Sequence, residues 1–348
     1  MDNKKETITT AETPRDLLRP ELLTVSPSPH IKAAERTGTI MFDVIIALLP
    51  AFIWGVYNFG IRALVIGLIG VASSVGFEAL SRYLLRRPST VGDLSAAVTG
   101  LLLAMNLPVT VPLWMPVVGS FFAIVVVKQL FGGIGKNFVN PALCARVFLF
   151  SWAGEMTAFP KFGERVTSLA VTLAEGDIVA GATPLAALKN GELPEVGVVD
   201  MAMGNISGCI GETSALLLLI GLVYLLARKI INLRIPVAFI GTVAVLTFLF
   251  PQGGNDNLSW MAYQLLSGGL LLGAIFMATD YVTSPITKLG QVIFGIGCGV
   301  LTVVIRYFGG YPEGVSYAIL IMNCCVVLLD RIGRPKKFGA PKKEVAKG

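Results

Sequence analysis

Residues 40–59 read IMFDVIIALLPAFIWGVYNF, an apolar run of twenty residues with a single charge, Asp43. A helix that crosses a bilayer needs about 20 such residues, so this stretch predicts a first membrane crossing. Similar segments recur along the rest of the chain. We expect ten transmembrane helices, at about residues 40–59, 63–81, 91–107, 114–131, 138–152, 213–228, 235–250, 259–279, 290–307 and 315–330.

Composition assigns the whole chain to the membrane class. Hydrophobic residues make up 54% of the 348 positions, against about 45–50% in ordinary globular proteins. Charged residues make up 14%, against about 25%, and mean hydropathy is +0.73. The net charge of +6 comes from Lys and Arg in the tails and between apolar segments. These features exclude a soluble enzyme, a disordered chain and a nucleic-acid binder, and they indicate an all-α polytopic protein in a lipid membrane.

Residues that could ligate a metal are scarce. The single histidine, His30, lies in the polar N-terminal arm, which excludes bis-histidine haem ligation within the bilayer and histidine-based zinc sites. The five cysteines show no C-x-x-C spacing, and most lie in apolar segments where we expect them to pack as small side chains. We therefore expect no metal site.

The distribution of Lys and Arg predicts the orientation, because cytoplasmic loops of membrane proteins carry an excess of both. With a cytoplasmic N-terminus, 22 of the 28 Lys and Arg residues lie on the cytoplasmic side. Both termini are therefore expected in the cytoplasm, and the long hydrophilic insertion is expected outside. Residues 153–212 carry 3 positive and 8 negative side chains, as expected for a translocated loop.

Two pairs of similar stretches indicate an internal duplication. AMNLPVTVP at 104–112 resembles ATDYVTSP at 278–285, and Phe-Gly-Gly at 131–133 recurs at 308–310. Each half of the chain carries five apolar segments. Because five is an odd number, the second half must enter the membrane upside down relative to the first. Inverted repeats of this kind are common in transporters and channels.

The expected architecture is therefore two inverted five-helix repeats joined by an outer loop. In such folds, binding sites lie at interrupted helices near the membrane midplane, which directs attention to Asn106 and Asp280. Asp280 fits two interpretations, a helix-end carboxylate at the surface or an ion-path carboxylate paired across the pseudo-axis with Asn106. The domains are an arm at 1–37, a first repeat at 38–152, an outer loop at 153–210, a second repeat at 211–332 and a basic tail at 333–348.

One motif in the outer loop is suited to covalent chemistry. Residues 177–185 read DIVAGATPL. Thr183 offers a hydroxyl nucleophile, the small residues Gly181 and Ala182 leave room around it, and Pro184 biases it toward extended backbone. The same residues also fit a plain turn in which Thr183 is the N-cap of a short helix.

This motif resembles the D-x-x-[ST]-[GS]-A-T sequence at which a flavin transferase attaches FMN to threonine through a phosphoester. A second stretch, GGIGKNFVNPAL at 132–143, resembles the segment G-G-x-G-x-N-x-x-N-P-A-L of the RnfD/NqrB family of ion-translocating electron-transport complexes. GCIGETS at 208–214 and the stretch 277–285 resemble the same family. The resemblance extends from about residue 26 to 331, and the length is closer to the RnfD-type members.

The resemblance implies FMN bound covalently to Thr183, with Asp177, Gly181 and Ala182 completing the attachment motif. Ala180 departs from the pattern, because the family often has Ser or Thr there. An ester through phosphate leaves the flavin ring unmodified, so the redox chemistry stays that of the cofactor. A second flavin, a non-covalent riboflavin between the helices, is a further expectation from the NqrB-like resemblance.

Complexes of this family pass electrons between ferredoxin and NAD while moving Na⁺ or H⁺ across a prokaryotic cell membrane. The chain has no Rossmann fingerprint and no iron–sulfur ligand set. We therefore expect an electron relay with no catalytic residue of its own, assembled with the subunits RnfA, RnfB, RnfC, RnfE and RnfG and loaded by a flavin transferase. Arg146, inside an apolar segment, is expected to pair with a carboxylate such as Glu212 or to contact a flavin.

Two rival functions fit parts of the sequence. A five-plus-five inverted repeat also resembles the urea-transporter architecture, so a solute channel or transporter without a redox role shares the expected fold. A scaffold subunit that has lost its flavin is the other alternative, and Ala180 is the feature that points to it. The motif at 177–183 favours the redox function, because a bare channel does not need it.

Overall fold

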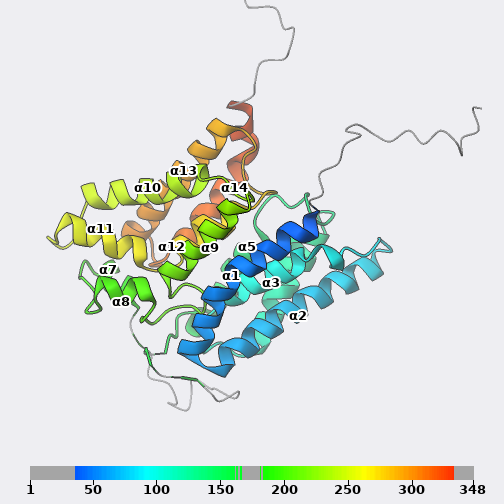
Figure 1. Ribbon diagram of the computed structural model, residues 1–348, viewed down its shortest axis with the longest axis horizontal. Coiled ribbons are helices and arrows are strands. Elements are labelled where there is room, and N and C mark those ends of the chain that lie inside the picture. Colours follow the sequence, from blue (N-terminus) through cyan, green and yellow to red (C-terminus); the bar gives the residue numbers. More distant parts are fainter. Residues whose placement is uncertain (1–35, 161, 164, 167–180, 182, 333–348) are drawn as a thin grey trace, which may run out of the picture. The chain divides into compact units, whose positions relative to one another are not determined.

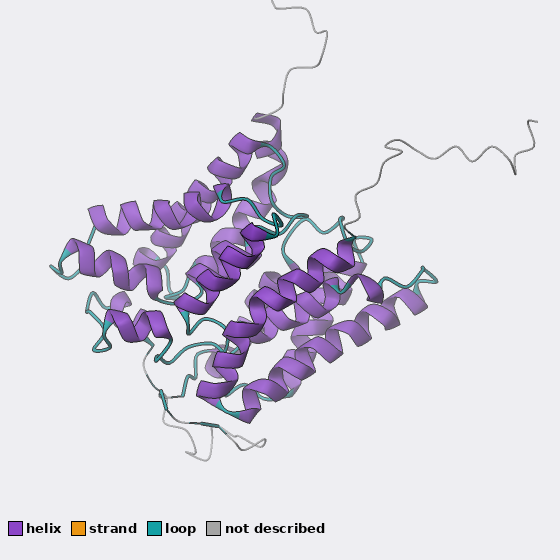
Figure 2. Cartoon of the chain, viewed as in Figure 1, coloured by secondary structure: helices purple, strands orange, loops and turns teal. Residues whose placement is uncertain are grey.

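The computed structural model describes residues 36–160, 162–163, 165–166, 181 and 183–332. The helices belong to one compact unit that begins at Thr37. Within the described residues every regular element is a helix (Figure 2), which agrees with the expected all-α class.

The helices fall into two groups, one that ends at Met156 and one that begins at Pro184. The first group contains α1 (Thr37–Phe59), α2 (Ile61–Leu84), η2 (Val91–Asp93), α3 (Ser95–Met105), α4 (Trp114–Phe121), the π-helix η3 (Phe122–Gln129), α5 (Pro141–Leu149), η4 (Phe150–Trp152) and α6 (Ala153–Met156). The second group contains α7 (Pro184–Lys189), α8 (Val198–Met203), α9 (Ala215–Ala227), α10 (Arg234–Leu249), α11 (Asn257–Leu266), α12 (Leu270–Leu272), the π-helix η6 (Gly273–Met277), α13 (Lys288–Phe308) and α14 (Val315–Ile332).

Among the described residues, four helices are long and apolar enough to cross a membrane on their own, namely α1, α2, α13 and α14. A fifth candidate is α11 with α12–η6, a pair bent by 63° at its break. Shorter apolar helices occupy four of the other expected segments, and they are α3, α4–η3, α9 and α10. The structure thus has four or five candidate spans by length and composition, and ten crossings stay a prediction.

Glycines allow the backbones of neighbouring helices to approach closely. A Cβ atom on Gly70 of α2 would lie 2.9 Å from the carbonyl oxygen of Gly100 of α3, closer than real Cβ contacts allow. On α13, a Cβ on Gly295 would meet the Ile235 carbonyl of α10 at 2.9 Å, and one on Gly299 would meet the Phe239 carbonyl at 3.0 Å. Such small-residue interfaces are typical of helix packing in membranes.

Helices that the expected duplication pairs with each other make similar contacts in the two halves. In the first half α2 packs against α3 and α4–η3, and in the second half α10 packs against α11 and α13. Contacts between the halves join α1 to α9 and α5 to α14. In Figure 1 the blue and cyan helices α1–α3 and the yellow to red helices α10–α14 follow this division. Both halves contribute to the main buried apolar core.

Candidate functional site

Thr183 is the residue that precedes α7 and caps it. Its backbone is extended, with φ −73° and ψ 152°, as Pro184 at the first helical position favours. Its Oγ1 accepts a hydrogen bond from the Ala186 amide at 3.3 Å. The capping turn and the extended presentation were both predicted, and they are compatible, because an ester oxygen at Thr183 can still accept from the Ala186 amide. The half-buried Gly181 donates a hydrogen bond from its amide to the Phe159 carbonyl at 2.8 Å.

Short as it is, α7 is anchored to the second half of the protein. Leu185 and Leu188 pack with the buried Trp260 of α11. At the end of the helix, the Lys189 ammonium donates to the Arg306 carbonyl of α13 at 3.1 Å and also to the Gly309 carbonyl. These contacts fix α7, and Thr183 with it, against α11 and α13.

Thr183 lines a cavity to which several distant segments contribute. Its lining includes three aromatic side chains, from η4, from the segment before Thr183 and from the segment before α14, and the charged groups of three residues from different parts of the chain. These aromatic and charged residues are Phe150, Phe159, Tyr311, Arg146, Glu212 and Glu313. The cavity therefore joins the outer segment to both halves.

Arg146 of α5 is the centre of a buried charged cluster in this cavity. Its Nη1 donates to Oε1 of Glu212 at 2.9 Å, the ion pair expected from the sequence. Its Nη2 donates to Oε2 of Glu313, just before α14, which the sequence did not indicate as a partner. Nη1 also donates to Oδ1 of Asn106 at 2.5 Å, at the end of α3. One guanidinium thus links the two halves.

The electrostatics of this cluster are unusual because one cation faces two carboxylates. The side chains of Arg146, Glu212 and Glu313 are 3%, 6% and 15% exposed. Burial is the largest cause that raises the pKa of Glu212 above its ordinary value, and the nearby Glu313 carboxylate is the second. Arg146 opposes this shift. Removing one member of a buried ion pair leaves an uncompensated charge, at a cost of about 3–5 kcal/mol. The two buried carboxylates therefore depend on the positive charge of Arg146.

Comparison with known protein families shows to which family the chain belongs. The sequence model of the NQR2, RnfD, RnfE family matches residues 24–339. The chain belongs to this family. The resemblance inferred from the motifs at 132–143, 177–183 and 208–214 is thereby confirmed.

Several relatives are similar over nearly their whole length. The chain is 49% identical to the D subunit of the Na⁺-translocating ferredoxin:NAD⁺ oxidoreductase complex of Acetobacterium woodii, covering 92% of this chain and 96% of that protein. It is 43% identical to the D subunit of the proton-translocating ferredoxin:NAD⁺ oxidoreductase complex of Clostridium ljungdahlii, covering 92% and 98%. It is 42% identical to the D subunit of the ion-translocating oxidoreductase complex of Stutzerimonas stutzeri, covering 86% and 91%.

A second cavity lies between other elements of the protein. It is lined by parts of α1, α3, α9 and η6, and Lys128, Asn140 and Asp280 contribute polar groups. Asn140 caps α5 by accepting from the Ala142 amide at 3.0 Å, and its amide donates to the Met277 carbonyl at 3.2 Å. This cavity, too, is lined by both halves.

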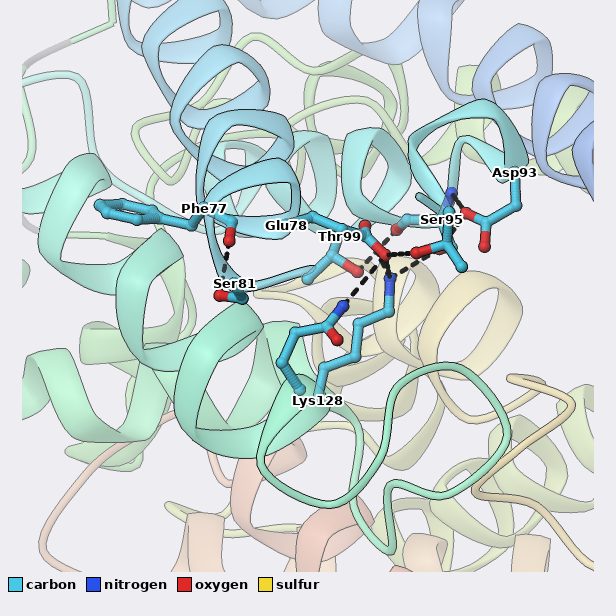
Figure 3. Close-up of polar contacts among 9 residues, drawn as sticks. Phe77, Glu78, Ser81, Asp93, Ser95, Thr99 and Lys128 are labelled. Atoms are coloured by element: carbon cyan, nitrogen blue, oxygen red, sulfur yellow. Dashed lines mark hydrogen bonds and ion pairs between the residues drawn. The ribbon is translucent and has the colours of Figure 1, made fainter. Parts of the chain in front are cut away.

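Lys128 at the edge of the second cavity belongs to a buried polar cluster within the first half (Figure 3). Its ammonium lies 3.0 Å from Oε2 of Glu78 and donates to the Ser95 hydroxyl at 2.6 Å. The Glu78 carboxylate also accepts from the Thr90 hydroxyl at 2.6 Å and from the Gln129 amide at 3.1 Å. The sticks in Figure 3 converge on Glu78 from neighbouring helices and the turn before α3.

The remaining predicted site residues lie where the two halves meet. Asn106 donates to the Leu102 carbonyl at 2.6 Å and to the Met277 sulfur at 3.8 Å, so its contact in the second half is η6. Asp280 accepts from the Thr283 hydroxyl at 3.0 Å and lines the second cavity. Their role in an ion path stays a prediction. Asp177 and Ala182 lie outside the described residues.

Sequence reasoning missed Glu313 and the Glu78–Lys128 pair. The sequence does indicate that these charged residues need partners, because a lone charge in or beside an apolar segment is costly. Glu78 lies within the expected segment 63–81, and Glu313 directly precedes the expected segment 315–330. The partners themselves are between 50 and 167 positions away in the chain, and that distance can be bridged only by the fold.

Proposed function

We propose that this chain is the membrane subunit of an Rnf-type oxidoreductase complex that carries FMN on Thr183 and relays electrons. The observation that carries the proposal is the position of Thr183, an extended, half-buried hydroxyl at a cavity with aromatic and charged walls. The relatives, which are named as D subunits of ferredoxin:NAD⁺ oxidoreductase complexes, support the assignment to an ion-translocating complex that couples ferredoxin and NAD.

The cavity residues fit a flavin. Aromatic side chains suit a flat ring, and Phe150 and Tyr311 lie with ring centroids 5.4 Å apart at one wall. Arg146 and Glu313 each carry a buried polar atom without a hydrogen-bond partner in the described part of the chain. Thr183 would hold the phosphate, and the aromatic wall would pack against the ring. When bound, the flavin supplies the electron-accepting and electron-donating chemistry.

Attachment to Thr183 is a phosphoryl transfer from a flavin dinucleotide. The bond between the two phosphates breaks, and a bond forms between the FMN phosphorus and Oγ1 of Thr183. The leaving group is the other nucleotide of the dinucleotide, released as its monophosphate, and the hydroxyl proton of Thr183 passes to solvent. A flavin transferase would catalyse this step. In the product, Oγ1 keeps a lone pair with which to accept from the Ala186 amide, so α7 stays capped.

The proposal includes the way in which the chain crosses the membrane. The matching contacts of α2 with α3 and α4–η3, and of α10 with α11 and α13, support two five-helix repeats in inverted orientation. The Lys and Arg distribution supports cytoplasmic termini and an outer location for Thr183. Electrons then pass at the outer face, while Na⁺ or H⁺ moves past the interrupted segments at Asn106 and Asp280.

The chain acts only with other subunits in this proposal. The part of the chain that the structure describes has no group of His, Cys, Asp and Glu residues suited to a metal. RnfA, RnfB, RnfC, RnfE and RnfG would supply the remaining redox sites. A second, non-covalent flavin such as riboflavin belongs to the same proposal.

Covalent flavin can be tested on a denaturing gel. The full chain is expressed with a flavin transferase, separated in SDS and viewed under ultraviolet light, beside Thr183→Val and a control, Thr157→Val. Thr157 lines the same cavity, and within the described residues its hydroxyl donates to the Ala153 carbonyl of the same helical turn. We expect fluorescence in the wild type and the control and none in Thr183→Val. A dark wild-type band, with the transferase active on another substrate, would reject the attachment and favour a solute channel.

A further inference from the structure

Two polar atoms in the cavity beside Thr183 have no hydrogen-bond partner among the described residues. They are Nε of Arg146, a donor, and Oε1 of Glu313, an acceptor, and both atoms are buried. Buried polar atoms in native proteins are almost always paired. An unpaired donor and an unpaired acceptor on neighbouring side chains of one cavity therefore indicate a ligand that supplies the missing partners.

The rest of the cluster holds both side chains in place. Both terminal nitrogens of Arg146 are already engaged, Nη1 by Glu212 and Asn106 and Nη2 by Oε2 of Glu313. This clamp fixes the guanidinium plane, so Nε cannot turn toward another acceptor. Glu313 is fixed by the same ion pair, and Nε of Arg306 donates to its backbone carbonyl at 3.3 Å.

A donor beside an acceptor matches one edge of the isoalloxazine ring. That pyrimidine edge presents a carbonyl, an N3–H group and a second carbonyl in a row. We propose that Arg146 and Glu313 bind this edge, with Arg146 Nε–H donating to a ring carbonyl and Glu313 Oε1 accepting from N3–H. The inference rests on the proposed function, because it assigns residues to the flavin held by Thr183. It makes Arg146 and Glu313 flavin-binding residues and Glu212 a positioning residue.

The assignment has a consequence for the reduction potential of the flavin. Reduction adds negative charge to the pyrimidine side of the ring, so a cation beside it stabilises the reduced form and an anion destabilises it. Loss of the Arg146 charge should therefore lower the midpoint potential, and loss of the Glu313 charge should raise it. Glu313→Gln keeps the size of the side chain but also places a donor opposite N3–H, where the ring needs an acceptor.

The test is a reductive titration of the detergent-solubilised full chain carrying covalent flavin, followed by flavin absorbance. The variants are Arg146→Gln and Glu313→Gln, with Arg62→Gln as the matched control. Arg62 is equally buried, donates to the Val109 and Val111 carbonyls and is not among the residues that line this cavity. We expect a lower potential for Arg146→Gln, a higher one for Glu313→Gln and a wild-type value for Arg62→Gln.

Failure of the inference is distinguishable from failure of the proposed function. If the wild type and both variants carry flavin on Thr183 and all have the same potential, the pyrimidine-edge assignment is wrong while the attachment stands. If no protein acquires flavin, the proposed function itself fails. Should Arg146→Gln not fold, Glu313→Gln decides alone, because a raised potential supports the assignment and an unchanged or lowered one overturns it.

Discussion

The two buried ion-pair clusters of this protein differ in how completely their charges are satisfied. In the first half, the Glu78 carboxylate accepts from Lys128, Thr90 and Gln129, and Lys128 has Ser95 as a further partner. The atom left over in that cluster, Oε1 of Gln129, belongs to a neutral amide. In the cluster around Arg146 the atoms left over belong to the ion pair itself, one donor on Arg146 and one acceptor on Glu313. A cluster whose charges are saturated holds helices together, whereas one with unused donors and acceptors is prepared for a ligand.

The clusters also differ in what they connect. Glu78 and Lys128 lie on α2 and η3 of the same half. Arg146 lies in the first half, and its carboxylate partners, Glu212 and Glu313, lie beyond the outer loop. Loss of the first cluster should therefore loosen one half, while loss of the second should loosen the contact between halves and disturb the cavity at Thr183.

The largest effect is expected for Arg146→Gln, which leaves two buried carboxylates without their cation. Removing one partner of a buried pair typically costs about 3–5 kcal/mol, and we expect at least that loss in the free energy of unfolding. Unfolding in a detergent–SDS series, followed by tryptophan fluorescence, measures it. An Arg146→Gln protein as stable as the wild type would mean that this cluster does not hold the halves together.

Lys128→Met should come next, at about 3 kcal/mol, the lower end of the same range. It leaves one carboxylate, Glu78, which keeps the Thr90 and Gln129 donors. The double variant Glu78→Gln, Lys128→Met should regain most of the loss, because no charge is then left unpaired. Flavin attachment and potential should not change in either protein. A shifted potential would show that the two clusters are not separate in function.

These first two predictions show what the sequence could and could not supply. The apolar runs and the Pro after Thr183 act locally, so the membrane class and the extended Thr183 could be predicted. The Arg146–Glu212 pair spans 66 positions, and it could be proposed because Glu212 directly precedes the next expected apolar segment. Glu313 could not be identified as a partner, because it is 167 positions from Arg146. Lys128 lies within the expected segment 114–131, but its partner Glu78 is 50 positions away, so this pair could not be identified either.

A purely steric change should destabilise the Arg146 cluster less than the loss of a charge does. A Cβ atom on Gly269 would meet Oε1 of Glu212 at 2.7 Å and Oε1 of Glu313 at 2.8 Å. Gly269→Ala therefore pushes on both carboxylates without altering charge, and overpacking of this kind costs about 1–3 kcal/mol. Gly154→Ala is the control, since its Cβ would have no atom within 4 Å. The same SDS unfolding series applies, and equal stabilities for the two variants would contradict the geometry.

The smallest effect is expected for Thr90→Val, which removes one of several hydrogen bonds to the Glu78 carboxylate. A hydrogen bond to a charged group contributes about 1.5–3 kcal/mol, and we expect the lower value because Thr90 is only half-buried. A loss as large as that of Lys128→Met would mean that the Glu78 cluster is not saturated.

The central claim, FMN on Thr183, is tested most directly by mass spectrometry of one tryptic peptide. Cleavage after Arg165 and Lys189 releases residues 166–189, which contain Thr183 and three other hydroxyl side chains, Thr167, Ser168 and Thr172. From protein made with an active flavin transferase, we predict a peptide heavier by one FMN phosphoryl group, and fragmentation that places the added mass on Thr183. An unmodified peptide, or the added mass on one of the other hydroxyls, would contradict the claim.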